Sequence, residues 1–305
     1  MRLVFMGTPA IAAVCLRRLQ EDGHEIVAVY TKPDTPKNRG MKMLPSEVKE
    51  AALEYGLRVI QPDTFRDDAV VEELRSLAPD LIACVAYGKI LPQRVLDIPA
   101  LGCVNIHASI LPALRGAGPI QWAILNGLEE TGVTAMYMAK EMDAGDIIEI
   151  VRTPIDPAET SEELTARLAE LGAELLSKTV ADIAAGIIHR TPQDPEQASY
   201  APMLTKEQSP IDWTRTRRQI LDQVRGLIPW PVASCELEGK RFKIYGAEPA
   251  EVAVAAEPGT ALALDKRGLI IACGDGALRI TQLQAEGGKR MSAPDYFRGH
   301  PISLP

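Results

Sequence analysis

Asn105 and His107 are the residues whose types and spacing offer the clearest chemistry. They stand two positions apart in a strand-like segment, so their side chains leave the same face of the chain. An amide donor beside an imidazole can stabilise an oxyanion and move a proton near neutral pH. Spacing alone fits a buried histidine with a turn-forming asparagine equally well, so both interpretations stay open at this point.

Asp143 is the second candidate, because it follows a strand-like segment that ends at Met138. A carboxylate in this place could accept a hydrogen bond from the imidazole, set its tautomer and stabilise its charged form. The residues DAGD at 143–146 also fit a solvated Asp-Gly turn, which is the simpler interpretation of this segment by itself.

A basic loop follows the Pro-Asp turn at residues 33–34. It carries Lys37, Arg39 and Lys42 around Gly40, and no acidic residue interrupts it. Such a loop suits contacts to phosphate groups. An ordinary solvated loop has the same composition, and composition alone favours that alternative.

The elements that must position these residues alternate between strand-like and helix-like segments. The strand candidates lie at 3–6, 26–30, 81–87, 104–107 and 133–138, and residues 160–188 form the clearest helix, with Thr160 and Glu163 as a capping pattern. This alternation predicts a Rossmann-like α/β domain, a parallel sheet with helices on both faces. The turn GTP at 7–9 lacks the further glycines of a dinucleotide-binding loop.

The last third of the chain has a different character. Residues 191–210 hold four prolines, and five short strand candidates follow between 233 and 283, separated by glycines. We predict a domain at 1–190, a linker at 191–207 and a small OB-like β-barrel domain at 208–305. The sequence Pro229-Trp230-Pro231 would present one indole near the domain junction.

Composition and charge exclude some classes of protein. The net charge of -8 argues against a generally basic nucleic-acid coat, although residues 206–305 carry 14 basic and 12 acidic residues, a net of +2. Five cysteines without a C-x-x-C pair predict a reducing, cytoplasmic setting, and four scattered histidines predict no metal site. We expect a monomer with no signal peptide and no membrane span.

The segment NIHASILPALRGAGP resembles the signature of the folate-dependent formyltransferases, N-x-H-x-S-L-L-P followed by R-G-x-x-P. The segments FMGTPAIA, VAYGKILP and EMDAGDII, and IDW with PWP, resemble further motifs of that family in the same order, so the resemblance covers essentially the whole chain. The chain departs from the pattern at Ala113, where a basic residue is common, at Ile110, where Leu is usual, and at Ile11, where an aromatic residue is common.

The resemblance implies a formyl transfer from 10-formyltetrahydrofolate, without a metal, in which Asn105, His107 and Asp143 are catalytic. It also implies a binding site for the folate co-substrate, formed by Tyr87, Gly88, Ile90, Leu91, Ser109, Ile110, Leu111 and Pro112.

The acceptor follows from the basic loop, which is similar to that of the family members that formylate initiator methionyl-tRNA. In those proteins the matching R-G-x-K loop enters the acceptor end, so Arg39 and Lys42 are implied to bind tRNA, and the C-terminal domain to contact the acceptor arm. Two alternatives remain: an amino-sugar nucleotide as acceptor, and a non-enzymatic RNA-binding module. The second would need stacking aromatics, and the barrel strands carry few beyond Phe242 and Tyr245.

Overall fold

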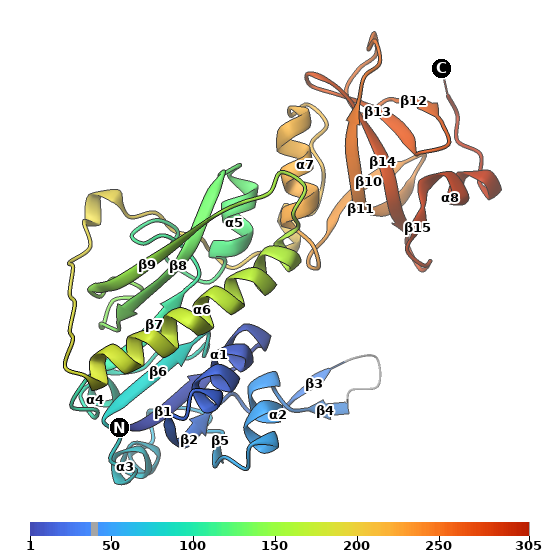
Figure 1. The fold of residues 1–305 in the computed structure, drawn as a ribbon. Helices are drawn as coiled ribbons and strands as arrows, with labels where there is room; N and C mark the ends of the chain where they lie inside the picture. Colours follow the sequence, from blue (N-terminus) through green and yellow to red (C-terminus); the bar gives the residue numbers. More distant parts are fainter. Residues whose placement is uncertain (38–41, 305) are drawn as a thin grey trace. The chain divides into compact units, whose positions relative to one another are not determined.

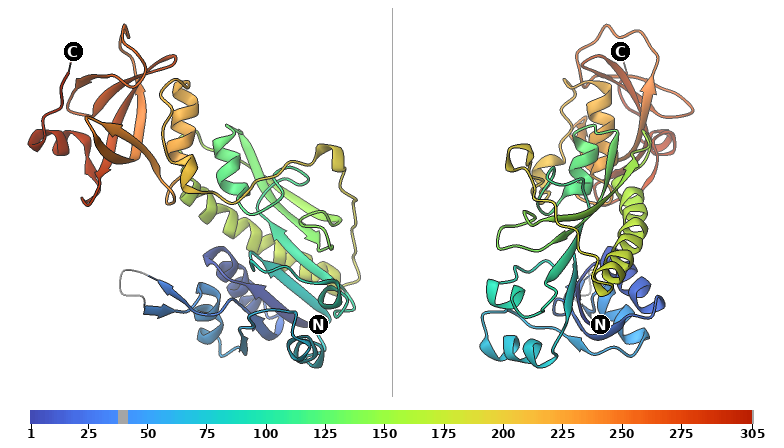
Figure 2. Two further views of the ribbon diagram at one scale, coloured as in Figure 1. Left: turned by 180° about the vertical axis from the view of Figure 1, so that it is seen from behind. Right: turned by 60° about the vertical axis from the view of Figure 1, so that its left-hand side comes forward.

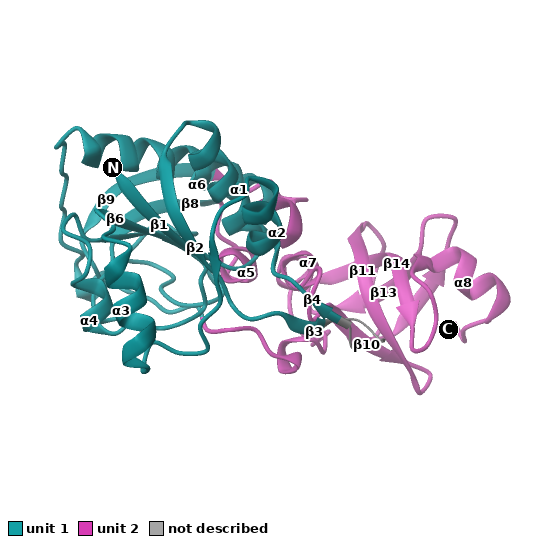
Figure 3. Ribbon diagram, turned by 90° about the horizontal axis from the view of Figure 1, so that it is seen from below, with its two compact units in different colours: residues 1–119, 130–153, 165–201 teal, residues 120–129, 154–164, 202–305 magenta. Residues whose placement is uncertain are grey.

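The computed structural model describes residues 1–37 and 42–304. These residues form two compact units (Figure 3). Unit 1 comprises 1–119, 130–153 and 165–201, and unit 2 comprises 120–129, 154–164 and 202–305. Among the described residues, each helix is too short or too polar to cross a lipid bilayer.

A seven-stranded sheet with the order β5-β2-β1-β6-β7-β8-β9 forms the centre of unit 1 (Figure 1). β1 pairs in parallel with β2 and β6, and β6 pairs in parallel with β7, as the alternation of elements predicted. The strands are β1 (Arg2–Gly7), β2 (Glu25–Tyr30), β5 (Val59–Ile60), β6 (Leu81–Val85), β7 (Cys103–His107), β8 (Glu130–Tyr137) and β9 (Ile147–Pro154).

The prediction of a parallel sheet fails at β8, which runs antiparallel to β7. A parallel neighbour needs a crossover connection that packs on the sheet. The helix between these strands, α5 (Pro119–Leu125), contributes most of its residues to unit 2 instead. Composition could not show this difference, because the predicted segment 133–138 is mostly apolar, as a strand of a parallel sheet would be. The strand β9 was not predicted at all.

Helices cover both faces of this sheet, as expected. On one face, Val4 of β1 and Ile82 of β6 share a core with Leu74 of α3 (Asp68–Ser76) and Val95 of α4 (Gln93–Leu96). On the other face lie α1 (Ala10–Glu21) and α6 (Ser161–Ala184), and Gly172 of α6 packs against side chains of β7 and β8. Figure 3 shows α1 and α6 opposite α3 and α4.

The N-terminus of α6 has the predicted cap. Both the backbone N–H and the hydroxyl of Thr160 donate to the Glu163 carboxylate, each at 2.8 Å. The helix ends at Ala184, and Gly186 follows with a φ of 77°, the left-handed conformation that glycine adopts most readily.

The predicted basic loop is carried by a two-stranded antiparallel hairpin of β3 (Thr35–Lys37) and β4 (Lys42–Leu44). The hairpin projects from the seven-stranded sheet, ahead of α2 (Glu47–Glu54) (Figures 1 and 2). Residues 38–41, and with them Arg39, lie outside the described residues.

Unit 2 contains an antiparallel sheet with the order β10-β11-β14-β13-β12, and β15 pairs with β14. Phe242 and Ile244 of β11 lie in its core with Ile220 of α7 (Arg217–Gly226) and Phe297 of α8 (Ala293–Gly299). The strands are β10 (Ala233–Leu237), β11 (Lys240–Ala250), β12 (Ala261–Leu264), β13 (Leu269–Cys273), β14 (Gly276–Ala285) and β15 (Met291–Ser292). The five predicted strands are confirmed, and closure into an OB-like barrel stays a prediction.

Residues 191–201, which the sequence placed in a linker, lie within unit 1. They include η1 (Pro195–Gln197) and bridge to unit 1 at two positions, Thr191 with Ile147 and Tyr200 with Arg115. The domain boundaries themselves stay a prediction, but this stretch has a local structural role that its proline content did not reveal.

Candidate active site

Asn105 and His107 leave the same face of β7, the face that α3 and α4 cover. Their neighbour at the same spacing, Cys103, is buried in the core of that face, whereas Asn105 is only half-buried. The Asn105 amide has no hydrogen-bond partner among the described residues, so its donor and acceptor atoms are free for a ligand. His107 is 6 % exposed at the carboxyl end of the strand.

An oxygen atom faces each ring nitrogen of His107. Nε2 lies 2.9 Å from the Leu114 carbonyl, and Nδ1 lies 3.6 Å from Oδ2 of Asp143. The same Oδ2 accepts a hydrogen bond of 2.8 Å from the Gly116 backbone N–H. The structure therefore brings two of the three predicted catalytic side chains together and places the third on the same strand face.

Asp143 follows the end of β8, which lies near the start of β7, whereas His107 lies at the end of β7. Because β8 is antiparallel, His107 pairs with Thr134, and β8 ends at Tyr137 beside Val104, near the start of β7. The segment after β8 must fold back to bring Asp143 to the ring. It does so in a tight turn: Asp143 has a φ of 53°, and a side chain at Gly145 would collide with the Tyr137 carbonyl.

The loop 109–112, implied to bind the folate co-substrate, is held by its own hydrogen bonds. The Ser109 hydroxyl donates to the Ala113 carbonyl at 2.6 Å. The buried Thr134 hydroxyl donates to the Ser109 carbonyl at 2.6 Å and accepts from the Leu111 N–H at 3.2 Å. The Ser109 and Leu111 side chains are buried, whereas Ile110 and Pro112 are partly exposed, so these two offer the contact surface of the loop.

Thr134 and Ser199 are site residues that sequence reasoning missed. Thr134 fixes the loop from β8, and Ser199 Oγ accepts the Leu114 N–H at 2.9 Å, next to the carbonyl that faces His107. Neither residue belongs to a recognisable motif. The only sequence signal for Thr134 is a hydroxyl within an apolar strand.

The second implied part of the folate site follows β6. Its parallel neighbour is β7, so both segments leave the same edge of the sheet. Ile90 is 80 % exposed, and Gly88 has a φ of 74°, the left-handed conformation that glycine adopts most readily. The Tyr87 ring is 1 % exposed and packs edge-on against Phe65, and Leu91 is also buried. Tyr87 thus offers its backbone at this edge, and its ring belongs to the core.

The residues implied to bind tRNA are only partly described. Arg39 lies outside the described residues, and Lys42 lies in β4, at the base of the hairpin. Their implied role therefore stays a prediction.

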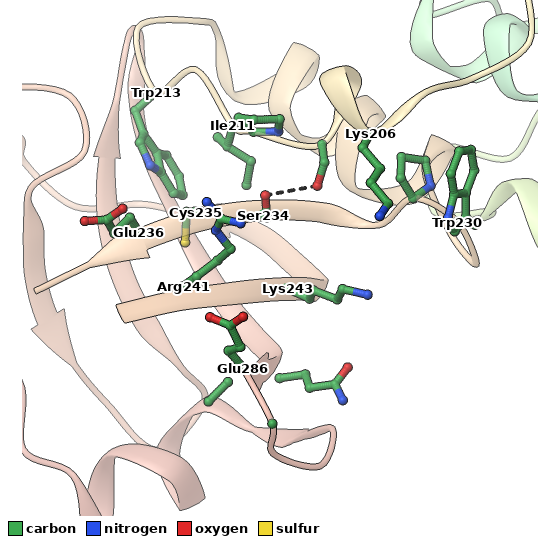
Figure 4. A pocket seen from close by; sticks show the side chains of 16 residues that line it. Lys206, Ile211, Trp213, Trp230, Ser234, Cys235, Glu236, Arg241, Lys243 and Glu286 are labelled. Carbon is green, nitrogen blue, oxygen red and sulfur yellow. Dashed lines mark hydrogen bonds between the residues drawn. The ribbon is translucent and has the colours of Figure 1, made fainter. Parts of the chain in front are cut away.

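A groove on unit 2 combines basic and aromatic side chains (Figure 4). Lys206, Arg241 and Lys243 line it, and these three side chains have no acidic partner among the described residues. Trp213 and Trp230 also line it, and Trp230, which the sequence singled out, is 50 % exposed. Two acidic residues, Glu236 and Glu286, also line the groove. Cations gathered in a groove suit contacts with the phosphate groups of a nucleic acid.

Two family profiles match this chain. Residues 1–180 match the family described as formyl transferase, and residues 203–301 match the family described as formyl transferase, C-terminal domain. The chain belongs to the formyl transferase family. The resemblance inferred from the motifs is therefore confirmed across both parts of the chain.

Curated members of this family match the chain over nearly its full length. A methionyl-tRNA formyltransferase of Bacillus subtilis (strain 168) is 46% identical over 299 residues, covering 98% of this chain and 94% of that protein. A methionyl-tRNA formyltransferase of Moorella thermoacetica is 47% identical over 302 residues, covering 99% and 97%.

Solved structures of formyl transferases share the fold at low sequence identity. HypX from Aquifex aeolicus, in complex with tetrahydrofolic acid, superimposes with a TM-score of 0.68 at 21% identity, over 100% of this chain and 48% of HypX. An N-formyltransferase from Helicobacter canadensis, in complex with folinic acid and dTDP-3-aminofucose, gives a TM-score of 0.69 at 20% identity, over 91% and 98%. At these identities the likeness supports the fold alone.

Proposed function

We propose that this protein transfers the formyl group of 10-formyltetrahydrofolate to the amino group of initiator methionyl-tRNA, in translation initiation. The observation that carries the proposal is the 46% identity to a methionyl-tRNA formyltransferase over 98% of the chain, including the C-terminal family domain. The N-formyltransferase that was solved with dTDP-3-aminofucose shares the fold, but its sequence is only 20% identical to this chain.

In the proposed reaction, the methionyl amine attacks the formyl carbon. A tetrahedral intermediate forms, the bond between that carbon and N10 of the folate breaks, and the amide of formylmethionyl-tRNA remains. The amine loses a proton and N10 gains one. His107 is the proton carrier in this scheme, because its imidazole lies on the same face of β7 as the Asn105 amide and directly before the loop 109–112.

The negative charge of the intermediate develops on the formyl oxygen. The Asn105 amide and the His107 Nε2–H are the proposed donors to this oxygen, at a typical contribution of about 3 kcal/mol each. In the structure Nε2 faces the Leu114 carbonyl, so the formyl oxygen would replace that carbonyl as the acceptor. Asp143 beside Nδ1 would hold the ring in its orientation and stabilise the imidazolium.

The folate co-substrate fits the edge of the sheet where β6 and β7 end. We propose that its ring lies between the exposed Ile90 side of the segment 87–91 and the Ile110 and Pro112 side of the loop 109–112. The rigid hydrogen bonds of that loop support this placement, because a preformed wall loses little conformational freedom on binding.

We propose that the tRNA meets two surfaces of the protein. The segment with Arg39 and Lys42 would hold the acceptor end, and the basic groove of unit 2 would hold the acceptor arm through its phosphates. The positive balance of residues 206–305 within an acidic chain supports this division of roles.

A formylation assay with two alternative acceptors tests the proposal. Purified protein is given 10-formyltetrahydrofolate with either methionyl-tRNA or an amino-sugar nucleotide, and the formylated product is measured. We expect transfer to methionyl-tRNA only. Transfer to the amino sugar alone would replace the proposed acceptor, and tRNA binding without any transfer would favour an RNA-binding module.

A further inference from the structure

The segment 191–201 is bound along the loop that follows His107. It pairs with β9 through Thr191 and Ile147, whose backbones exchange hydrogen bonds of 2.8 and 2.9 Å. It then pairs with the loop at Arg115, whose N–H donates to Ser199 O at 2.8 Å and whose carbonyl accepts from Ala201 N at 2.7 Å. In Figure 2 this segment begins after the end of α6 and runs along the outside of unit 1.

Gln193 of this segment makes four hydrogen bonds with its side-chain amide. Its Oε1 accepts from Arg115 Nε at 3.1 Å and from Arg115 Nη2 at 2.7 Å. Its Nε2 donates to the Asp143 carbonyl and to the Gly145 carbonyl, both at 2.8 Å. Because a guanidinium only donates and a carbonyl only accepts, this network fixes which end of the amide is oxygen.

The two partners of Gln193 belong to the two segments whose oxygen atoms face the His107 ring. Arg115, which is 4 % exposed, stands between Leu114, whose carbonyl faces Nε2, and Gly116, whose N–H binds the Asp143 carboxylate. Asp143 itself faces Nδ1. One glutamine amide therefore connects the groups that face both ring nitrogens.

The turn that Gln193 holds is not one that the chain adopts freely. Asp143 is in the left-handed region at a φ of 53°, which aspartate adopts more readily than most residues with a side chain but less readily than glycine. Such a conformation persists only where its surroundings hold it. Both donors of the Gln193 amide bind this turn, one on each side of Ala144.

We propose that Gln193 is a positioning residue for the transfer reaction, which holds the Asp143 carboxylate against the His107 ring by tying the 143–145 turn to Arg115. This inference rests on the proposed function. Gln193 acts through Asp143 and binds no atom of the loop 109–112. Its loss should therefore lower kcat and leave the KM values for both substrates almost unchanged.

Two substitutions separate positioning from folding. Gln193→Ala removes all four hydrogen bonds. Gln193→Glu keeps an acceptor for Arg115 but cannot donate to the two carbonyls, so it keeps the segment attached while it releases the turn. For both variants we expect kcat to fall about tenfold or more, with KM for each substrate within about twofold of the parent.

Gln197 offers a matched control in the same segment. It is exposed, and among the described residues its side-chain amide donates only to Asp194, at 2.8 Å. Gln197→Ala should leave kcat within about twofold of the parent value. A parental kcat in Gln193→Glu would overturn the inference, and so would a rise in KM without a fall in kcat.

A double mutant tests whether Gln193 acts through Asp143. If it does, Gln193→Ala added to Asp143→Asn should lower kcat by no more than about twofold beyond the single Asp143→Asn variant. If the double variant instead loses kcat by the product of the two single-variant losses, Gln193 acts independently of the carboxylate and the inference is wrong.

Hydrogen exchange of the Gly116 amide gives a readout that needs no activity. Its N–H donates to Asp143 Oδ2, so both Gln193 variants should speed its exchange about tenfold or more, while Gln197→Ala should not. Unchanged exchange would overturn the inference. A parent protein that formylates no methionyl-tRNA would refute the proposed function instead, and the exchange result would still decide the role of Gln193.

Discussion

His107 is held between two oxygen atoms whose origins differ. Leu114 O comes from the loop that follows β7, and Asp143 Oδ2 comes from the turn after β8. Both positions depend on backbone conformations that are rare for residues with side chains, a φ of 58° at Leu114 and of 53° at Asp143. Left-handed residues cluster at functional sites, where the surrounding contacts maintain them.

Replacing Asp143 by Asn tests the charge beside His107 separately from the shape of the turn. The amide oxygen can still accept from the Gly116 N–H, so the turn should persist, whereas the negative charge is lost. We expect kcat to fall about a hundredfold or more, with little change in melting temperature. Steady-state formylation assays and thermal unfolding measure the two quantities.

His107→Ala should abolish transfer, because it removes the proposed proton carrier and one donor to the formyl oxygen. His189→Ala is the matched control, since His189 is exposed outside this site. A His107→Ala variant with activity within a factor of about five of the parent would show that the imidazole has no chemical role.

Asn105→Ala removes one donor to the proposed oxyanion and leaves the imidazole in place. The expected loss in kcat is about a hundredfold, the usual effect of deleting one such donor. The KM for the formyl donor should change little, because the interaction strengthens only as the charge develops. An increase in KM at constant kcat would instead make Asn105 a ground-state contact.

At the scale of elements, the sequence predicted the buried strands well and their direction less well. β1, β2, β6 and β7 are apolar, and their parallel direction followed from the alternation with helices. The antiparallel β8 could not be predicted, because direction depends on where the connection packs and not on the residues of the strand. The short hairpin of β3 and β4 was hidden by its charged residues and proline.

The residues of the candidate site were also only partly predictable from the sequence. The motif residues Asn105, His107 and Asp143 could be found because the motifs that contain them resemble those of a known family and follow in the same order, whereas their types and spacing alone left simpler interpretations open. Thr134, Ser199 and Gln193 could not, since each is an ordinary polar residue whose partner lies far away in the sequence. Gln193 stood in a proline-containing stretch, whose composition resembles a linker although it is bound to unit 1.

The capping box of α6 predicts a pH dependence of stability. Hydrogen bonds from the backbone and hydroxyl of Thr160 lower the pKa of the Glu163 carboxyl below its usual value, about 4.3 in an unfolded chain. A lowered pKa stabilises the folded state above that value, and the contribution is lost as the pH falls through the folded pKa.

Glu163→Ala should therefore reduce the free energy of unfolding near neutral pH and have a smaller effect at about pH 3. Urea unfolding of the parent and the variant at both pH values measures the difference. Equal destabilisation at both pH values would mean that the carboxylate charge does not contribute to the cap.

At the scale of the whole molecule, charge is distributed unevenly. The chain is acidic overall, yet Lys206, Arg241 and Lys243 gather in one groove of unit 2 with two tryptophans (Figure 4). Binding of a polyanion by such a chain depends on local placement of cations and should weaken as salt rises. The sequence indicated this only as a weak positive balance in the last third.

Lys243→Glu tests the groove. It should raise the KM for methionyl-tRNA several-fold and leave the KM for 10-formyltetrahydrofolate unchanged, because only the tRNA carries phosphates along its arm. Lys240→Glu is the matched control, since it lies on the same strand, changes the charge equally and does not line the groove. Equal effects of the two variants would indicate a general charge effect.

The most direct measurement of the central claim is a single-turnover assay with excess protein, labelled 10-formyltetrahydrofolate and methionyl-tRNA. We predict that the label appears on the methionyl amine at a rate that falls about a hundredfold or more in both Asp143→Asn and His107→Ala. A parent protein that transfers no label to methionyl-tRNA, or variants that transfer it at the parental rate, would contradict the proposed function and its site.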